Sequence, residues 1–201
     1  MTDLLLGTTN PGKQREFGRL LATLPARVVG PKEIGLQLDV AEPHPSYAEN
    51  ATAKATAYCR ASGLLTLADD SGIEVAALDW GPGARSARFG DVASEHADRL
   101  LSALRHASDR RARMVCFLAL AVPVDGEPRV ELFTGVMEGE ISREKRGDGG
   151  FGYDPIFLLP SGMTTAELPE GDKDRISHRG RAVAAATPRL RALLAAPHPP
   201  A

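Results

Sequence analysis

The chain has 201 residues, enough for one domain with a substantial core, since domains near 150 residues already bury roughly 68–70% of their unfolded surface. With 43% apolar residues, 25% charged residues and a net charge of −2, the surface as a whole offers no strong attraction to duplex DNA or acidic membranes. The two cysteines, Cys59 and Cys116, stand far apart, which argues against a disulfide framework or a thiolate zinc site. No apolar run reaches the roughly 18 residues of a membrane span, and the first residues lack a signal-peptide pattern. We therefore expect a cytoplasmic protein that binds neither nucleic acid nor membranes.

The first third of the chain has the signals of one strand and two helices. Asn10 and Pro11 suit the N-cap and the first position of a helix, whose apolar residues recur at helical spacing. Ser46 and Glu49 form a capping box for a second, alanine-rich helix, which Gly63 ends. In chain order, the sequence predicts a buried strand over 4–7, a helix that includes 17–24, a polar loop over 39–45 and a helix over 46–62.

Strands dominate the middle of the chain. Residues 64–68 read as a strand that is closed by a turn over 69–72. The nearly unbroken apolar run over 114–122 predicts a central strand, and the alternating segment 129–141 predicts its hairpin partner. The other predicted elements are a strand over 73–78, a loop over 81–83, a helix over 94–107 with Ser94 as its cap, a glycine-rich loop over 147–153, a strand over 156–159, a helix over 177–196 interrupted near Pro188, and a disordered tail over 197–201. This mixture of helices and strands predicts a single α/β domain over 1–196 with a mixed sheet.

The turn before the first helix, from Thr8 to Lys13, has features that suit a phosphate chain. The first N–H groups of a helix lack internal partners and lie at a positive dipole end, which favours anions. Lys13, in the first turn, adds a charge. The spacing of a Walker A motif is absent, and an ordinary capped helix with a solvated lysine explains the same residues when they are taken alone.

Two adjacent acids, Asp69 and Asp70, mark a possible metal site. Neighbouring carboxylates repel each other unless a positive group offsets them, and a divalent cation would do so. Because successive side chains of a strand point to opposite faces, one acid can face a cleft while the other supports the turn. Together, Glu42 and Asp70 would supply the one or two carboxylates that Mg²⁺ usually takes from a protein. The alternatives are an ordinary acidic loop pair at 69–70 and a solvated surface acid at 42.

The run 149–155 interleaves glycines with two aromatic residues and an acid. Glycines allow close approach to a ligand, and Phe151 and Tyr153 offer flat faces for a base. Asp154 is placed to accept hydrogen bonds from a base or a ribose. A plain glycine hairpin loop rarely combines these residues, so this pattern favours a functional role.

The last helix is predicted to begin with cations. Ser177 suits its N-cap, so that His178 and Arg179 lie in the first turn, where positive charge opposes the helix dipole. This unfavourable placement indicates a ligand with anionic or acceptor groups. A surface charge run over 172–179 is the simpler alternative.

Taken in order, these segments resemble the inosine/xanthosine triphosphate pyrophosphatase family, the RdgB/HAM1-like enzymes. The resemblance covers nearly the whole chain and is carried by 8–13, 49–51 with Lys54, 68–72, 82–83 with 86–88, 149–155 and 177–179. It implies an elongated mixed β-sheet flanked by helices, with two lobes around a central substrate cleft, and a homodimer. It also implies Mg²⁺-dependent hydrolysis of ITP, dITP and XTP to the monophosphate and pyrophosphate, which keeps these nucleotides out of DNA and RNA.

The same resemblance assigns roles to single residues. It implies that Asp70 is the general base and that Glu42 and Asp70 hold Mg²⁺. Two positions depart from the family pattern: Ala41 stands where relatives often have a second acid, and Trp80 stands where many have glycine. The substrate contacts that the resemblance implies are Thr8, Thr9, Asn10, Pro11, Gly12, Lys13, Lys54, Ser71, Arg88, Phe151, Gly152, Tyr153, Asp154, Lys173, His178 and Arg179.

Two other functions are compatible with these patterns. One is a Maf-like pyrophosphatase that acts on other nucleotides, and the other is a non-catalytic nucleotide- or RNA-binding protein. The near-neutral charge and the lack of a basic, aromatic-rich stripe argue against RNA.

Overall fold

The structure, a computed structural model, describes residues 2–89 and 95–195. Within these residues one mixed, seven-stranded sheet has the order β2-β1-β3-β5-β6-β7, and β4 pairs with β3 beside this path. The strand β1 is parallel to β2 and to β3, whereas the other pairs are antiparallel. The strands are β1 (Thr2–Leu6), β2 (Ala26–Val29), β3 (Leu65–Val75), β4 (Gly81–Pro82), β5 (Arg111–Val122), β6 (Arg129–Ile141) and β7 (Phe157–Leu158). The predicted α/β class with a mixed sheet is confirmed.

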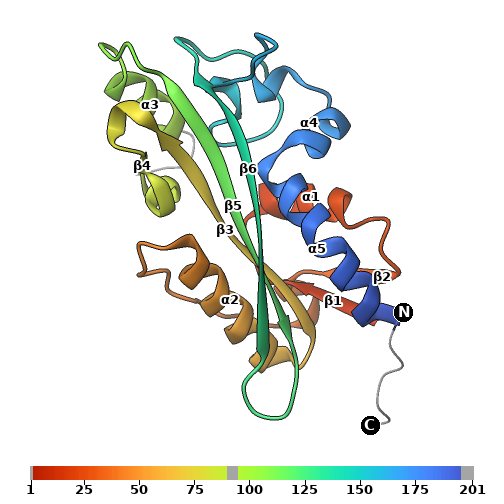
Figure 1. The fold of residues 1–201 in the computed structure, drawn as a ribbon. Coiled ribbons are helices and arrows are strands. Elements are labelled where there is room, and N and C mark those ends of the chain that lie inside the picture. Colours follow the sequence, from red (N-terminus) through yellow and green to blue (C-terminus); the bar gives the residue numbers. More distant parts are fainter. Residues whose placement is uncertain (1, 90–94, 196–201) are drawn as a thin grey trace.

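Helices cover both faces of the long strands (Figure 1). One face carries α2, and the opposite face carries α1 and α5. None of the helices among the described residues is long and apolar enough to cross a membrane. The helices are α1 (Pro11–Leu20), α2 (Tyr47–Ser62), α3 (His96–Ala103), α4 (Glu170–Ile176) and α5 (His178–Ala195).

The core is divided along the length of the sheet. One cluster packs α1 and α5 on the sheet through Phe17, Leu118 and Val183, and a small alanine-rich cluster lies under α2. A separate cluster at the other end of the long strands includes Leu100 and Phe157. Because β3, β5 and β6 run through both ends, the molecule is elongated (Figure 1).

The helix boundaries follow from their caps. The Asn10 side chain accepts hydrogen bonds from the N–H groups of Gly12 (2.9 Å) and Lys13 (3.1 Å), and α1 begins at Pro11. Ser46 caps α2 by accepting from the Glu49 N–H group. Gly63 ends α2 in the left-handed region, with φ 68°, which glycine adopts without strain. The predicted caps Asn10, Ser46 and Gly63 are confirmed, whereas of the predicted capping box of Ser46 and Glu49 the structure shows the bond to Ser46 Oγ alone.

The predicted turn over 69–72 is wrong, because these residues continue β3 without a break. Asp69 and Asp70 pair with Leu118 and Phe117 of β5. The long apolar strand β5 offers backbone partners along the whole of β3, so the polar side chains do not end the strand. On its other edge, β3 loses its parallel partner where β1 ends, with Leu6 opposite Leu67. Among the described residues, no strand covers that edge again until β4 pairs with Glu74 and Val75.

Several other boundaries differ from the predictions. A separate strand was predicted over 73–78. In the structure, residues up to Val75 belong to β3, and a 3₁₀ helix follows over Ala76–Leu78. The predicted helix 94–107 is confined to α3, and Ser94 lies outside the described residues, as do 196–201 with the predicted tail. Helix α5 continues through Pro188, because packing of its apolar face compensates for one lost hydrogen bond. The strand β2 and the helix α4 were missed.

Candidate active site

A cleft of about 640 Å³ opens along the free edge of β3. The N-terminus of α1, the loop before α2, the aromatic loop 149–155 and the start of α5 surround it. All predicted site residues line this cleft except Arg88 and Lys173. The lining residues among them are Thr8, Thr9, Asn10, Pro11, Gly12, Lys13, Glu42, Lys54, Asp70, Ser71, Phe151, Gly152, Tyr153, Asp154, His178 and Arg179.

The start of α1 is less open to anions than its sequence predicts. The Asn10 carboxamide already accepts from the N–H groups of Gly12 and Lys13, and Asn10 N–H donates to Thr8 Oγ1 (3.2 Å). A phosphate would therefore meet the side chains of the turn and Lys13 rather than free helical N–H groups. Lys13 Nζ lies 2.9 Å from Asp69 Oδ2, which holds its charge at the cleft.

Asp69 and Asp70 have opposite environments because they face opposite sides of β3. The Asp69 side chain is fully buried beside Lys13 and lies 3.6 Å from Arg179 Nε. Although burial favours its protonated form, these cations hold the pKa of Asp69 well below its usual range. Asp70 faces α2, where its Oδ1 accepts from Ser71 N–H and its Oδ2 from Asn50 Nδ2, both at 3.0 Å.

Asp70 has the properties of a carboxylate poised to take a proton. Burial raises its pKa, with a smaller upward effect from the Glu42 carboxylate, while Lys54 and Asn50 oppose the change. A buried carboxylate with a raised pKa, at the wall of a cleft, is typical of a general base.

The pair Glu42 and Asp70 fits a magnesium ion. Both are hard oxygen donors that line one cleft, and although burial is the main cause of the raised pKa of Asp70, the Glu42 carboxylate adds a smaller effect in the same direction. Among residues 2–89 and 95–195, no three His, Cys, Asp or Glu side chains are grouped to cage a metal by themselves. The donor set therefore suits Mg²⁺, which usually keeps waters and takes substrate phosphates as further ligands.

Lys54 and Arg88 hold the loop that carries Glu42. Lys54 Nζ pairs with the Glu42 carboxylate and donates to Asp69 O at 2.6 Å, so its charge lies at the cleft wall. Arg88 donates to the Glu42 backbone oxygen (3.0 Å) and lies 3.7 Å from its carboxylate. The exposed Arg88 thus contacts the outside of this loop rather than the cleft.

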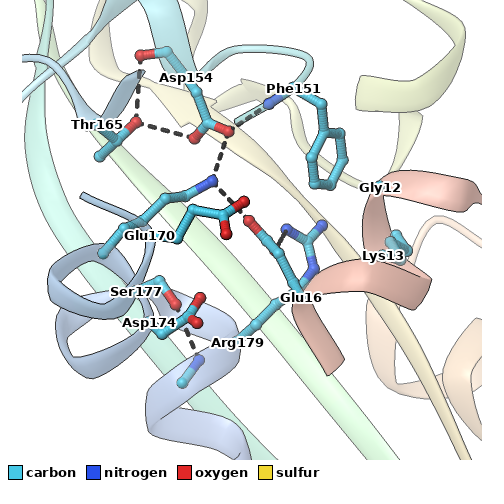
Figure 2. Close-up of polar contacts among 12 residues, drawn as sticks. Gly12, Lys13, Glu16, Phe151, Asp154, Thr165, Glu170, Asp174, Ser177 and Arg179 are labelled. Atoms are coloured by element: carbon cyan, nitrogen blue, oxygen red, sulfur yellow. Dashed lines mark hydrogen bonds and ion pairs between the residues drawn. The ribbon is translucent and has the colours of Figure 1, made fainter. Parts of the chain in front are cut away.

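The aromatic loop is held from behind by Asp154. Its buried carboxylate accepts from Phe151 N–H (2.7 Å), Thr165 Oγ1 (2.9 Å) and Lys173 Nζ (2.5 Å) (Figure 2). These partners fix the loop, so the structure places Asp154 as a support of Phe151 rather than as a free acceptor. Gly150, with φ 70°, is required there, because a Cβ atom would lie 2.1 Å from the Asp154 carboxylate.

The two aromatic rings of the loop have different positions. Tyr153 is buried, donates to Ser86 O (2.8 Å) and stacks on His96 at 5.9 Å between ring centroids. The half-buried Phe151 ring packs on Gly12 beside the start of α1 (Figure 2). Arg179 lies 5.1 Å from the centroid of the same ring. Phe151 is therefore the ring better placed to contact a base.

Glu16, which sequence reasoning missed, explains the cations at the start of α5. Its carboxylate is 4% exposed and binds Lys173 Nζ (2.5 Å) and Arg179 Nη1 (2.9 Å). Lys173 lies on α4, and its ammonium group contacts the buried carboxylates of Glu16 and Asp154 instead of the cleft. The positive charge at the helix start is thus balanced within the protein, so its placement does not by itself indicate a ligand. Glu16 precedes Phe17 and lies four residues before Leu20, a position on the apolar face that could have marked it as an inward-facing acid.

His178 and Arg179 reach the cleft in different charge states. Burial, reinforced by Arg179 and Lys173, holds the pKa of His178 well below its usual range, so its imidazole is neutral. His178 Nδ1 is buried without a hydrogen-bond partner among the described residues. Arg179 stays charged and donates to Ser71 Oγ at 2.8 Å as well as to Glu16. Both side chains line the cleft beside Phe151.

Comparison with known proteins places this arrangement in a family. The sequence model of the Ham1 family matches residues 4–189. A dITP/XTP pyrophosphatase of Ralstonia nicotianae is 43% identical over 198 residues, which cover 95% of this chain and 98% of the relative. A HAM1 protein from Coxiella burnetii has a structure similar to this one, with a TM-score of 0.81, 38% identity, and 96% and 98% of the two chains covered. A nucleoside-triphosphatase / dITP/XTP pyrophosphatase from Mycobacterium abscessus is similar with a TM-score of 0.71 and 36% identity, covering 93% of this chain and 100% of that one. The chain therefore belongs to the Ham1 family.

Proposed function

We propose that this protein hydrolyses non-canonical purine nucleoside triphosphates, such as dITP, ITP and XTP, to the monophosphate and pyrophosphate, and so keeps them out of DNA and RNA. One observation carries the proposal: a poised carboxylate, two lysines and an aromatic face converge on a single cleft from distant parts of the chain. The relatives named dITP/XTP pyrophosphatases support the substrate class.

In the proposed reaction, Asp70 acts as the general base. Its carboxylate orients or deprotonates a water molecule that attacks in line, and the bond between the α- and β-phosphates breaks. Lys13 and Lys54 supply fixed positive charge for the phosphate oxygens, where charge develops in the transition state. Their acidic partners, Asp69 and Glu42, keep both ammonium groups at the cleft before substrate arrives.

We assign Mg²⁺ to Glu42 and Asp70. When bound, the ion neutralises phosphate charge and helps to hold the triphosphate. The protein side of the site contributes the two carboxylates, and the triphosphate would complete the set of oxygen ligands.

Base selection is assigned to the side chains near Phe151. Inosine and xanthosine carry an acceptor oxygen at C6, where adenosine carries a donor amino group. The Arg179 guanidinium, or the N–H group of neutral His178, would pair with this oxygen and leave an adenine amino group unpaired. A site built to pair one polar group can reject the wrong one by up to ~10⁴–10⁵-fold. We further propose that the protein acts in the cytoplasm as a homodimer.

A pyrophosphate-release assay across ITP, dITP, XTP, dGTP and dATP, with and without Mg²⁺, tests the function. We expect Mg²⁺-dependent release, with kcat/KM highest for the inosine and xanthosine nucleotides. Equal kcat/KM values across the panel would refute the specificity. A preference for pyrimidine or modified nucleotides would favour a Maf-like enzyme. The absence of release from every nucleotide would favour a non-catalytic nucleotide-binding protein.

A further inference from the structure

Asn50 lies in the first turn of α2, and its side chain uses all of its hydrogen-bonding groups. The residue is 1% exposed. Its Oδ1 accepts from His44 N–H (3.1 Å), and its Nδ2 donates to His44 O and to Asp70 Oδ2, both at 3.0 Å. Only one orientation of the amide satisfies all three contacts. His44 O and Asp70 Oδ2 each need a donor, which the amide nitrogen supplies, and the His44 N–H group needs an acceptor, which the amide oxygen supplies.

The Asn50 side chain is not needed to begin the helix. Ser46 Oγ already accepts from Glu49 N–H at the N-cap, and the Asn50 N–H group bonds to Ser46 O as in any first turn. The carboxamide instead points away from the helix start toward the preceding loop and β3. Because a polar group is buried at a cost unless it is paired, a fully paired buried amide at this point indicates a specific task.

The contacts of Asn50 join two parts of the site that are far apart in the sequence. By holding both backbone groups of His44, the amide fixes the loop two residues after Glu42. By donating to Oδ2, it fixes one oxygen of Asp70, while Ser71 N–H fixes the other. The plane of the carboxylate and the position of the Glu42 loop therefore depend on the same side chain.

We propose that Asn50 is a positioning residue, whose amide sets the Asp70 carboxylate and the Glu42 loop in the relative geometry that the reaction needs. The inference rests on the proposed hydrolysis and goes beyond it by assigning a role to a residue that touches neither substrate nor metal. Residues that hold a metal ligand from behind typically change metal affinity or activity by roughly 10–100-fold when they are removed.

The test compares Asn50→Ala and Asn50→Leu with Ser46→Ala. Leucine has nearly the shape of asparagine and lacks its polar atoms, so it keeps the volume filled if the alanine variant folds poorly. Ser46→Ala is the matched control, because it weakens the start of the same helix without touching Asp70 or His44. For each protein we would measure kcat and KM for dITP, Mn²⁺ affinity by electron paramagnetic resonance, and the Tm.

At saturating Mg²⁺ we expect both Asn50 variants to lose roughly 10–100-fold in kcat with an unchanged KM, since the phosphate and base contacts remain. Their Mn²⁺ affinity should fall by a similar factor of roughly 10–100. Ser46→Ala should lower the Tm and leave kcat and Mn²⁺ affinity unchanged. Asn50 variants that match Ser46→Ala in kcat and Mn²⁺ affinity would overturn the inference. If the wild type released no pyrophosphate, the proposed function would fail by itself, and the Mn²⁺ affinities would still decide the role of Asn50.

Discussion

Replacing Glu16 with Gln should destabilise the fold by about 3 kcal/mol. Removing one partner of a buried ion pair typically costs about 3–5 kcal/mol, because an uncompensated charge is left behind. Two cations lose a partner here. Lys173 keeps the Asp154 carboxylate at 2.5 Å, whereas Arg179 keeps the Asp69 carboxylate at the longer distance of 3.6 Å and the neutral Ser71 hydroxyl at 2.8 Å. One incompletely paired cation therefore remains, which places the loss at the lower end of that range.

Urea unfolding followed by circular dichroism measures this loss. For a chain of this length, 1 kcal/mol corresponds to about 2–4 °C in Tm, so the variant should melt roughly 6–12 °C below the wild type. The matched control is Glu131→Gln, which removes a partner of Arg189 that is 31% exposed on both sides. Such half-exposed pairs contribute only about 0.2–1 kcal/mol. Equal losses in the two variants would refute the view that the Glu16 cluster is a buried, interdependent ion network.

The ion pairs of Glu16 also predict how its contribution to the unfolding free energy depends on pH. Although burial favours protonation of Glu16, Arg179 and Lys173 hold its pKa below the usual range. A depressed carboxyl pKa stabilises the fold above the unfolded pKa of about 4.3, and this stabilisation is lost as the pH falls through the folded pKa. Glu16→Gln should therefore show a shallower loss of unfolding free energy below about pH 4.3 than the wild type.

Three further predictions concern the cleft. Asp70→Asn should lower kcat roughly 10²–10⁴-fold in the pyrophosphate assay, and a wild-type kcat would contradict the role of Asp70. The unfolding free energy should fall by only about 1–3 kcal/mol, because the new amide can accept from one of the two donors, Ser71 N–H and Asn50 Nδ2, that the carboxylate binds. Because the pKa of buried His178 is depressed, the unfolded chain takes up a proton below about pH 6.5 that the folded chain does not, so stability should fall by up to about 1.4 kcal/mol per pH unit. His178→Gln should lose this slope between about pH 6.5 and 5 in urea titrations, and an unchanged slope would show that other groups cause it. Gly12→Ala places a methyl group 2.7 Å from the Phe151 ring and should destabilise by about 1–3 kcal/mol and raise KM for dITP. Its control is Gly18→Ala on the same helix, where no atom lies within 4 Å and KM should not change; equal KM values for the two variants would count against the packing of Phe151 on Gly12.

The sequence predicted those helices and strands that depend on interactions between neighbouring residues, such as helix caps and apolar runs. Asn10 and Ser46 marked the starts of two helices, and the apolar run of β5 marked a central strand. The predicted turn at Asp69 and Asp70 was wrong because these residues pair with Leu118 and Phe117 of β5, 49 and 47 residues further along the chain, and this pairing outweighs the low strand propensity of aspartate.

The site was predicted only in part, because some of its contacts join residues that are distant in the sequence. The resemblance to a family named most residues that line the cleft, including Asp70 and Phe151. It could not show that Asp154, although it lines the cleft, holds the Phe151 loop through its carboxylate, or that Lys173 lies behind the cleft. These roles depend on contacts with Glu16 and Thr165 that only the fold brings together, and the place of Glu16 on the apolar face of α1 was the one sign of them in the sequence.

The uncovered edge of β3 has a consequence for solubility. An open strand edge is a template on which another chain can add a strand, and this is a common route to aggregation. Here side chains form hydrogen bonds with backbone groups of this edge. Lys54 Nζ donates to Asp69 O, and Ser86 Oγ accepts from Ile73 N–H at 2.8 Å. The stretch of β3 that lines the cleft is therefore blocked to an added strand, so the same few side chains protect against self-association and leave the cleft open to a small ligand.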